Sequence, residues 1–523
     1  MSISRRNFIK GVATTGAAAA LSTTAVNAVA NNNAKDSAKK SNNPPLNLLI
    51  VFPDEMRAMA QGFKHQDPAI TPHLDAFAKT AKVMDQMASN YPLCSPFRGM
   101  FMTGKYPLHN GVTGNTHDYG GKVGIELSPY AKCWSDVLKD EGYSLGYIGK
   151  WHLDVPQEPY IKSYNNPMEG RYWNDWTPPD RRHGFDFWYS YGTYDLHLKP
   201  MYWGNDTPRE YPEYVDQWGP EHEADMAIKY LRNEGNQYRD PSKPFALVVS
   251  MNPPHSPYDQ VPQKYLDMYP QSSKELNTRP NIDWDKKYQE GYGPQYFKEY
   301  LAMVSGVDEQ FGRILAELDK QGLADNTLVV FFSDHGCCMG SHGAPTKNNI
   351  YEESMRVPMM FRLPGKIPAG VNESLMSAPD IYPTILDLLG FKDSIPDSVE
   401  GVSLAEQVLH DKGVSPTSQL YLFVPYGQPS FGRRGVRTKT HTLEVDRQDG
   451  EPLKYKLFDN VADPYQMKNI ADSNPELVQK LIKEELLPWL EKTGDSWRPV
   501  EFITGPTKKM KKQLESCTAP PKA

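Results

Sequence analysis

Apolar and polar positions follow two different patterns along the chain up to Gly401. Short, mostly apolar runs are typical of strands that are buried on both faces of a sheet, and they occur at residues 48–52, 144–148, 245–251, 327–332 and 359–361. Apolar residues spaced three or four apart predict a helix at residues 300–318, and a similar pattern predicts another at residues 71–87. Alternating strands and helices predict an α/β fold with a large, mostly parallel sheet flanked by helices.

The pattern changes after Gly401. Short strand-like runs at residues 420–424, 435–437, 441–445 and 455–458 are followed by a helical pattern at residues 475–492. This order predicts an antiparallel sheet plus a helix. We therefore expect a large domain at residues 46–410, a smaller C-terminal subdomain at residues 411–505 and a solvated basic tail at residues 506–523.

The N-terminus has the features of an export signal. Arg5 and Arg6 precede a weakly apolar run rich in alanine and threonine, and Ala28-Val29-Ala30 offers a cleavage site of small residues. These regions resemble a twin-arginine signal peptide over residues 1–30, which predicts export to the periplasm or secretion. Residues 31–45 are rich in asparagine, lysine and serine and are expected to be a disordered leader.

Charge and cysteine content exclude several classes of protein. The net charge is −7, and −10 without residues 1–30, so nothing indicates nucleic-acid binding, and an anionic substrate would need locally concentrated basic groups. The five cysteines are too irregularly spaced for a disulfide framework or a zinc site. No segment after the signal has the roughly 18 consecutive apolar residues of a membrane span.

Polar side chains follow four of the predicted strands. The pairs Asp54 and Glu55, Lys150 and His152, and Asp334 and His335 each follow one strand, and His255 follows another. Ligands of open α/β sheets bind at the carboxyl ends of the strands, so these side chains are expected to converge on one pocket.

Residues 151–245 form a long segment between two predicted strands. It contains six of the ten tryptophans, at positions 151, 173, 176, 188, 203 and 218. Aromatic rings on a surface loop can stack on sugar faces, or they can pack on one another. The sequence leaves both interpretations open.

The motif Cys94-Ser95-Pro96-Phe97-Arg98 resembles the signature of the type I, formylglycine-dependent sulfatases of the alkaline-phosphatase-like superfamily. Other segments resemble landmarks of that family and occur in the same order. They are residues 47–54, 71–75, 149–152, 254–257, 333–336, 347, 351–358, 380–390, 457–459 and 463–464. The resemblance therefore covers nearly the whole mature chain and implies an alkaline-phosphatase-like fold, in a bacterial carbohydrate sulfatase.

The resemblance also implies the nucleophile and the metal. A separate maturation enzyme would oxidise Cys94 to formylglycine, whose hydrate attacks sulfur. The implied ligands of a divalent cation are Asp54, Glu55, Cys94, Asp334 and His335. Ca²⁺ is favoured over Mg²⁺ or Mn²⁺, although many members have aspartate in place of Glu55 and asparagine in place of His335.

The remaining site residues follow from the same resemblance. Arg98 would position the formylglycine hydrate, and Lys150 and Lys347 would hold sulfate oxygens. His152 would assist a hydroxyl of the hydrate, and His255 would protonate the leaving alcohol. Two further histidines, His197 and His342, are expected to contact the substrate.

These features predict a sulfuric ester hydrolase that acts on a sulfated carbohydrate. Two alternatives stay open. The first is a phosphoester or phosphonate hydrolase of the same superfamily, because the Asp334-His335 pair also occurs in such enzymes. The second is a sulfated-glycan binder without catalysis, which would require that Cys94 is never oxidised.

Overall fold

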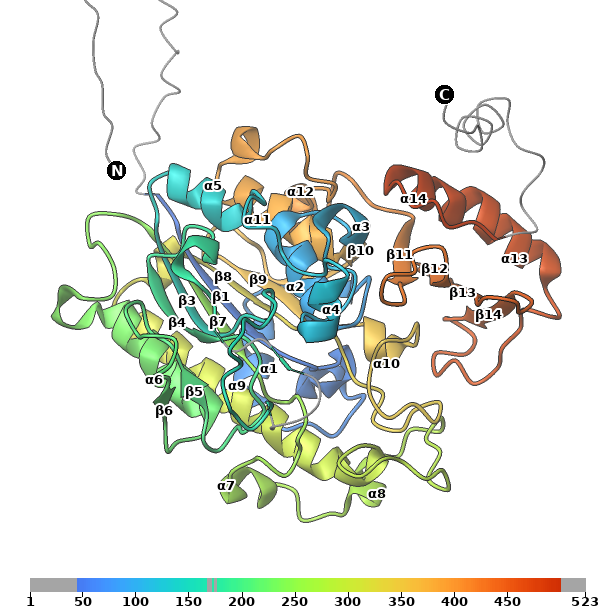
Figure 1. The fold of residues 1–523 in the computed structure, drawn as a ribbon, viewed down its shortest axis with the longest axis horizontal. Coiled ribbons are helices and arrows are strands. Elements are labelled where there is room, and N and C mark those ends of the chain that lie inside the picture. The colour runs from blue at the N-terminus through green and yellow to red at the C-terminus, as the bar shows by residue number, and fades with distance from the viewer. Residues whose placement is uncertain (1–44, 167–171, 174–175, 500–523) are drawn as a thin grey trace, which may run out of the picture. The chain divides into compact units, whose positions relative to one another are not determined.

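The apolar run at Asn47–Pro53 forms strand β1, which is buried along its whole length. The computed structural model describes residues 45–166, 172–173 and 176–499, and β1 lies within a sheet of eight strands there, in the order β10-β2-β9-β8-β1-β7-β3-β4 (Figure 1). The other strands are β2 (Lys82–Ala88), β3 (Ser144–Lys150), β4 (Phe187–Tyr191), β7 (Phe245–Met251), β8 (Thr327–Phe332), β9 (Met359–Arg362) and β10 (Gly370–Ser377).

The strands run mostly in one direction. β1 pairs in parallel with β7 and β8, and β3 pairs in parallel with β7 and β4. β9 is antiparallel to both of its neighbours, β2 and β8. The predicted α/β fold with a mostly parallel sheet is confirmed.

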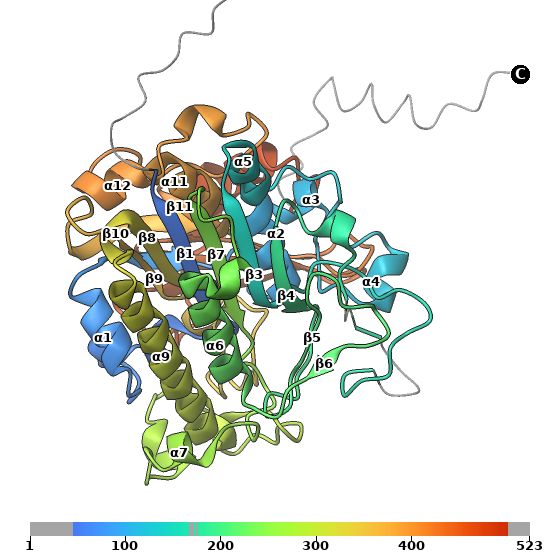
Figure 2. The same ribbon diagram turned by 90° about the vertical axis from the view of Figure 1, so that its left-hand side faces the viewer.

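Successive residues of β1 face opposite sides of the sheet. Leu48, Ile50 and Phe52 belong to one buried core, and Leu49 and Val51 belong to another. The first core includes residues of α2 (Cys94–Thr103), α5 (Trp134–Asp140), α11 (Ile381–Leu388) and α12 (Ala405–His410). The second includes residues of α1 (Pro72–Ala78), α6 (Gly219–Arg232) and α9 (Phe297–Lys320), which lie together on one side of the sheet in Figure 2. Helices therefore cover both faces, as expected.

The helix predicted at residues 71–87 is wrong in its second half. Only α1 is helical, and the chain then turns, with the N–H of Thr80 donating to the carbonyl of Phe77 (3.0 Å). Strand β2 follows and lies between β10 and β9. Its buried residues Val83 and Met84 face opposite cores, and tertiary pairing decides the structure of this segment over its local helical pattern.

The predicted C-terminal antiparallel sheet is present. It has the order β11 (Ser418–Phe423), β12 (Gly432–Thr438), β13 (His441–Arg447) and β14 (Lys454–Asp459). The helical segment follows as α13 (Pro475–Leu481), a π-helical turn (Ile482–Leu486) and α14 (Leu487–Lys492). Pro488 has no N–H for the helical ladder, which explains the irregular turn before it.

Residues 151–245 contribute to the large sheet. They form its edge strand β4, the short pair β5 (Met201–Tyr202) and β6 (Glu213–Tyr214), and helix α6. Four of their tryptophans are buried, namely Trp151, Trp188, Trp203 and Trp218. Most of these rings therefore pack in the interior.

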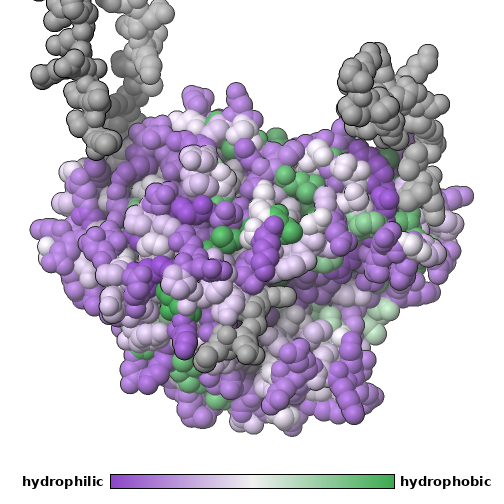
Figure 3. All heavy atoms as spheres, viewed as in Figure 1, coloured by the Kyte–Doolittle hydropathy of each residue, from purple (hydrophilic) through white to green (hydrophobic). Residues whose placement is uncertain are grey.

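The remaining short helices lie in connections. They are α3 (Pro107–Asn110), α4 (Asp118–Lys122), α7 (Gln263–Leu266), α8 (Ser273–Leu276) and α10 (Glu352–Met355). Among the described residues, no helix is long and apolar enough to cross a bilayer, and the face in Figure 3 is mostly hydrophilic. The predicted signal peptide, the leader up to residue 44 and the basic tail lie outside the described residues.

Candidate active site

Four neighbouring strands, β8, β1, β7 and β3, end at the same edge of the sheet. Asp334 follows β8, Asp54 follows β1, His255 follows β7, and β3 ends at Lys150. The N–H of Asp54 donates to the carbonyl of Met251 at the end of β7 (2.9 Å). Parallel pairing therefore brings together polar groups that are hundreds of residues apart in the sequence.

Cys94 is the first residue of α2, which faces this edge. The helix ends at Gly104, whose left-handed φ of 65° suits glycine. The Cys94 side chain is buried, and its Sγ lies 3.5 Å from Oδ1 of Asp54 and 3.3 Å from Nε2 of His335. The candidate nucleophile thus points into the polar cluster rather than into the apolar core.

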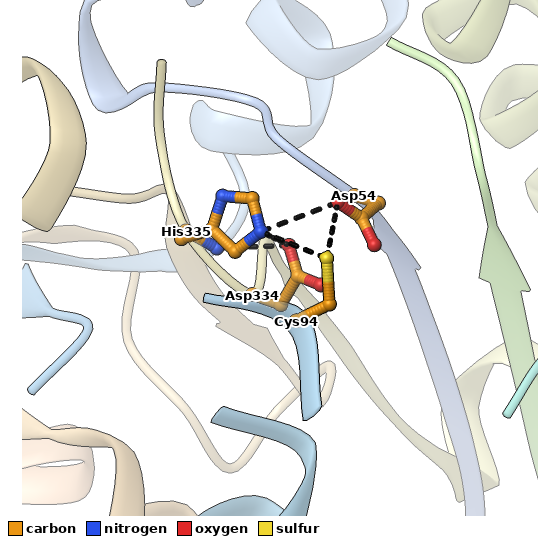
Figure 4. Close-up of side chains that lie close together, drawn as sticks. All are labelled: Asp54, Cys94, Asp334 and His335. Carbon is orange, nitrogen blue, oxygen red and sulfur yellow. Dashed lines mark hydrogen bonds and ion pairs between the residues drawn. The ribbon is translucent and has the colours of Figure 1, made fainter. Parts of the chain in front are cut away.

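Asp54, Cys94, Asp334 and His335 form one buried group (Figure 4). One potential ligand atom of each lies within 4.8 Å of the others. Burial raises the pKa of Asp334, and the charge of Asp54 raises it further. Burial lowers the pKa of His335, but the charge of Asp334 outweighs this and raises it to about 10. The group concentrates negative charge, so it favours a proton or a cation at its centre.

Arg98 ties this group to the strand ends. Its Nη2 donates to Oδ2 of Asp54 (3.1 Å) and to Oδ2 of Asp334 (3.2 Å). Its Nη1 donates to the carbonyl of Lys150 (2.6 Å) and to Oγ of Ser250 (2.8 Å). The guanidinium is buried and holds both carboxylates in fixed orientations.

Lys150 and Lys347 flank Cys94. Their Nζ atoms lie 3.8 Å and 3.7 Å from its Sγ. Burial lowers the pKa of each lysine, but the charges of Asp54 on Lys150 and of Cys94 and Glu55 on Lys347 raise it above the usual value. Both side chains therefore remain cations next to the candidate nucleophile.

Glu55 does not join the group around Cys94. Its Oε2 accepts from Nζ of Lys347 (2.7 Å) and lies 3.5 Å from Nε2 of His255. Its Oε1 accepts from the hydroxyl of Tyr258 (3.1 Å). The Glu55 carboxylate is thus turned towards a lysine and a histidine, in a backbone conformation with φ of 73° that is uncommon for this residue.

His152 follows β3 and is buried, with φ of 54°. Among the described residues, neither of its ring nitrogens has a hydrogen-bond partner. Burial and the charges of Lys150 and Arg98 lower the pKa of His152 well below its usual value. A buried, neutral imidazole without a hydrogen-bond partner, close to the charges of Lys150 and Arg98, is able to exchange a proton.

His255 lies against Glu55, the carboxylate that also accepts from Lys347. Its Nδ1 lies 2.6 Å from the carbonyl of Ser256, which fixes Nδ1 as a hydrogen-bond donor and leaves Nε2 facing Glu55. Burial and the charge of Lys347 lower the pKa of His255 well below its usual value.

The two histidines expected to contact the substrate have protein partners. His197 is buried, and its Nε2 lies 2.9 Å from the carbonyl oxygen of His255. His342 stacks on Tyr351 with ring centroids 3.7 Å apart, and its Nε2 lies 3.5 Å from Oε2 of Glu353. Both remain expectations as substrate contacts.

Four site residues were not anticipated from the sequence. Ser250 and Asn252 accept hydrogen bonds from Arg98 and Lys150, Tyr258 donates to Glu55, and Asp195 lies near His255. Position was a usable signal for Asn252, which directly follows β7. Asp195 lies 60 residues before His255 in the sequence, and only the fold brings the two together.

Comparison with known proteins identifies the family. A family model described as "Sulfatase" matches residues 46–391, "N-sulphoglucosamine sulphohydrolase, C-terminal" matches residues 340–492, and the "TAT (twin-arginine translocation) pathway signal sequence" matches residues 2–22. The endo-4-O-sulfatase of Bacteroides thetaiotaomicron is 39% identical over 490 residues, which cover 88% of this chain and 94% of that protein. The ulvan-active sulfatase of Formosa agariphila is 32% identical over 464 residues, which cover 87% and 83%.

Solved structures agree with these matches. The crystal structure of yidJ from Bacteroides fragilis superimposes with a TM-score of 0.82 at 44% identity, over 88% of this chain and 98% of that one. The fold, the order of the landmarks and the sequence matches all lead to one family. The chain belongs to the sulfatase family, and it is a sulfatase, a hydrolase of sulfate esters, with a signal for twin-arginine export to the periplasm or the medium.

Proposed function

We propose that this sulfatase removes sulfate from a sulfated carbohydrate, with formylglycine at position 94 and a divalent cation, preferably Ca²⁺. Two similar proteins support the substrate class. The Formosa agariphila relative is named for its activity on ulvan. A structure from work on glycosaminoglycan metabolism by Bacteroides thetaiotaomicron has a TM-score of 0.81 at 37% identity, over 88% of this chain and 99% of that one. Ulvan and glycosaminoglycans are both sulfated polysaccharides.

The residues around Cys94 fit a divalent cation. Asp54 and Asp334 offer carboxylate oxygens, which suit Ca²⁺, and His335 offers a nitrogen. The negative charge that raises the pKa of His335 to about 10 is equally suited to a bound cation. When bound, such an ion neutralises and polarises a sulfate group. The ligands we propose are Asp54, Asp334, His335 and an oxygen at position 94.

Two lysines are suited to hold the sulfate group. Lys150 is a buried cation and Lys347 is a partly buried one, and both lie within 4 Å of Cys94 Sγ. Each has an acidic partner at 2.7 Å, which is Asp54 for Lys150 and Glu55 for Lys347. These partners fix the ammonium groups before substrate arrives, so the site is preorganised for anionic oxygens.

Two histidines are suited to move protons. The ring nitrogens of His152 have no hydrogen-bond partner in the part of the chain that the structure describes, and the ring is held neutral, so it can take a proton from a hydroxyl at position 94. Once it is protonated at Nε2, His255 can give that proton to the leaving alcohol, because its Nδ1–H is engaged with Ser256. The hydrate of formylglycine supplies two hydroxyl groups on one carbon, which an unmodified cysteine or serine lacks.

A cavity of about 250 Å³ lies beside His255 and Lys347. It is also lined by Glu55, Gln289 and Tyr292. The alcohol that accepts a proton from His255 must occupy this cavity. The amide of Gln289 and the ring and hydroxyl of Tyr292 are groups that commonly bind sugars.

Maturation has to precede folding. Cys94 is only 1% exposed in the folded chain, so a separate maturation enzyme would need to reach it before α2 packs against the sheet. Twin-arginine export carries proteins that have already folded, so this order places the oxidation of Cys94 before export.

The observation that carries this proposal is the position of Cys94, buried between two lysine cations and a group of two carboxylates and an imidazole. The test is sulfate release by the enzyme, coexpressed with a formylglycine-generating enzyme, from a panel of sulfated oligosaccharides, phosphate monoesters and phosphonates. The proposal predicts release from at least one saccharide, and none by Cys94→Ala. Preference for a phosphate or phosphonate ester would overturn it.

A further inference from the structure

His255 has a carboxylate near each ring nitrogen. Oε2 of Glu55 lies 3.5 Å from Nε2, and Oδ1 of Asp195 lies 3.6 Å from Nδ1. Glu55 comes from the residues that follow β1, whereas Asp195 comes from the segment between β4 and β5. The imidazole therefore lies between two carboxylates, whose negative charge opposes the lowering of its pKa by burial and by Lys347.

Asp195 is held firmly in this place. Its Oδ2 accepts from Nδ2 of Asn165 (2.6 Å), and its N–H donates to Oδ1 of Asn165 (2.8 Å). Its Oδ1 accepts from Nδ2 of Asn252 (3.1 Å). Oδ1 of Asn252 in turn accepts from Nζ of Lys150 (2.9 Å). Asn252 therefore joins Asp195 to the lysine that is proposed to hold sulfate.

His197 supports the same imidazole from its backbone. Its Nε2 lies 2.9 Å from the carbonyl oxygen of His255, so Nε2 must carry the proton and donate. Burial lowers the pKa of His197, although the hydrogen bond to His255 opposes this shift. Two residues of one short segment therefore contact His255, Asp195 at the ring and His197 at the main chain.

We propose that Asp195 and His197 are positioning residues for His255, which hold its imidazole in the place from which the leaving alcohol takes up a proton. This inference rests on the proposed function of His255 as proton donor. It assigns a role to residues 194–197, which lie between the aromatic strands β4 and β5. Loss of this positioning must lower the rate strongly for alcohols that leave poorly without a proton, such as sugars, and only slightly for acidic phenols.

The test compares Asp195→Asn with wild type on a sulfated saccharide and on a series of phenyl sulfates with different phenol pKa values. Asp195→Asn keeps the shape of the side chain and removes its charge. We expect kcat to fall by about 10- to 100-fold for the saccharide and by less than about twofold for the most acidic phenols, with KM nearly unchanged. The matched control is Asp216→Asn, which removes a mostly exposed carboxylate from the same part of the chain.

A second variant guards against misfolding. Asn165→Ala removes a hydrogen-bond partner of Asp195 but leaves its charge, and we expect a smaller loss with the same dependence on the phenol. Equal losses on all substrates, or no loss in Asp195→Asn, would overturn the inference while leaving the proposed function intact. Absence of sulfate release by the mature wild-type enzyme would overturn both.

Discussion

Oε2 of Glu55 accepts a hydrogen bond from Nζ of Lys347 at 2.7 Å. Glu55 directly follows Asp54 in the chain, but its carboxylate lies outside the group formed by Asp54, Cys94, Asp334 and His335, and it belongs to a second group with Asp54 and His255. Glu55 therefore connects Lys347 with His255, which are the residues proposed to bind sulfate and to protonate the leaving alcohol.

Replacement of Glu55 tests this arrangement. Glu55→Gln should keep the metal content of wild type and lower kcat/KM by about 10- to 100-fold, because Lys347 and His255 lose a charged partner. Elemental analysis of the purified protein measures the metal, with Asp54→Asn as the variant expected to lose it. A drop in metal content in Glu55→Gln would instead make Glu55 a ligand, as the family resemblance implies.

Replacement of His152 should lower the activity of the enzyme without lowering its stability. Its ring makes no hydrogen bond among the described residues, so His152→Asn loses none, and asparagine tolerates the left-handed φ of 54°. We expect Tm to change by less than about 3 °C and kcat to fall by about 10²- to 10⁴-fold. Calorimetry and sulfate release measure the two. A variant with normal kcat would refute the role of His152 in proton transfer.

Replacement of Gln289 or Tyr292 should weaken the binding of a sulfated sugar more than that of a small aryl sulfate. Both line the cavity beside His255, and an aryl group would bury fewer polar atoms there than a sugar does. Tyr292→Ala and Gln289→Ala should raise KM for a sulfated saccharide by about 10-fold, with less than about a twofold change for phenyl sulfate. Tyr211→Ala, which removes an exposed ring, is the control. Equal effects on both substrates would place the sugar elsewhere.

Glu223 should make stability depend on pH. It is buried behind β3, where Tyr202 and Tyr191 donate to its Oε1, and burial raises its pKa from 4.5 to about 8. The folded chain holds a proton that the unfolded chain releases above pH 4.5, so this residue lowers stability as pH rises from about 4.5 to 8.

The variant Glu223→Gln removes this titration. The free energy of unfolding of the variant, relative to that of wild type, should therefore increase by about 1 kcal/mol or more as the pH rises from 5 to 8. Denaturant unfolding at several pH values measures the difference. Parallel curves for the two proteins would show that Glu223 does not hold a proton in the folded state.

The local pattern of apolar residues predicted a helix or strand correctly where the tertiary contacts of that segment favour the same structure. The apolar runs that became β1, β7 and β8 are buried on both faces, so their composition alone indicated strands. Residues 82–88 fit both a helix and a strand, and pairing with β10 and β9 decided the outcome. The sequence pattern does not indicate which strands pair with each other.

The candidate site was predictable where residues lie at or just after the ends of strands, as Asp54, Lys150 and Asp334 do. The direction of a side chain was not. Glu55 is adjacent to Asp54 yet faces Lys347, and His197 faces a main-chain carbonyl of His255. Contacts of this kind depend on positive φ values and on loops from distant segments, which leave no periodic signal in the sequence.

Mass spectrometry of the peptide containing Cys94 shows whether this residue becomes the aldehyde that carries the nucleophile. The protein should be coexpressed with a formylglycine-generating enzyme. The fraction of converted peptide is then compared with the rate of sulfate release by the same preparation. We expect a residue mass about 18 Da below that of cysteine, in a fraction of the protein that rises in proportion to sulfate release. A protein that releases sulfate at full rate while position 94 remains a thiol would contradict this expectation.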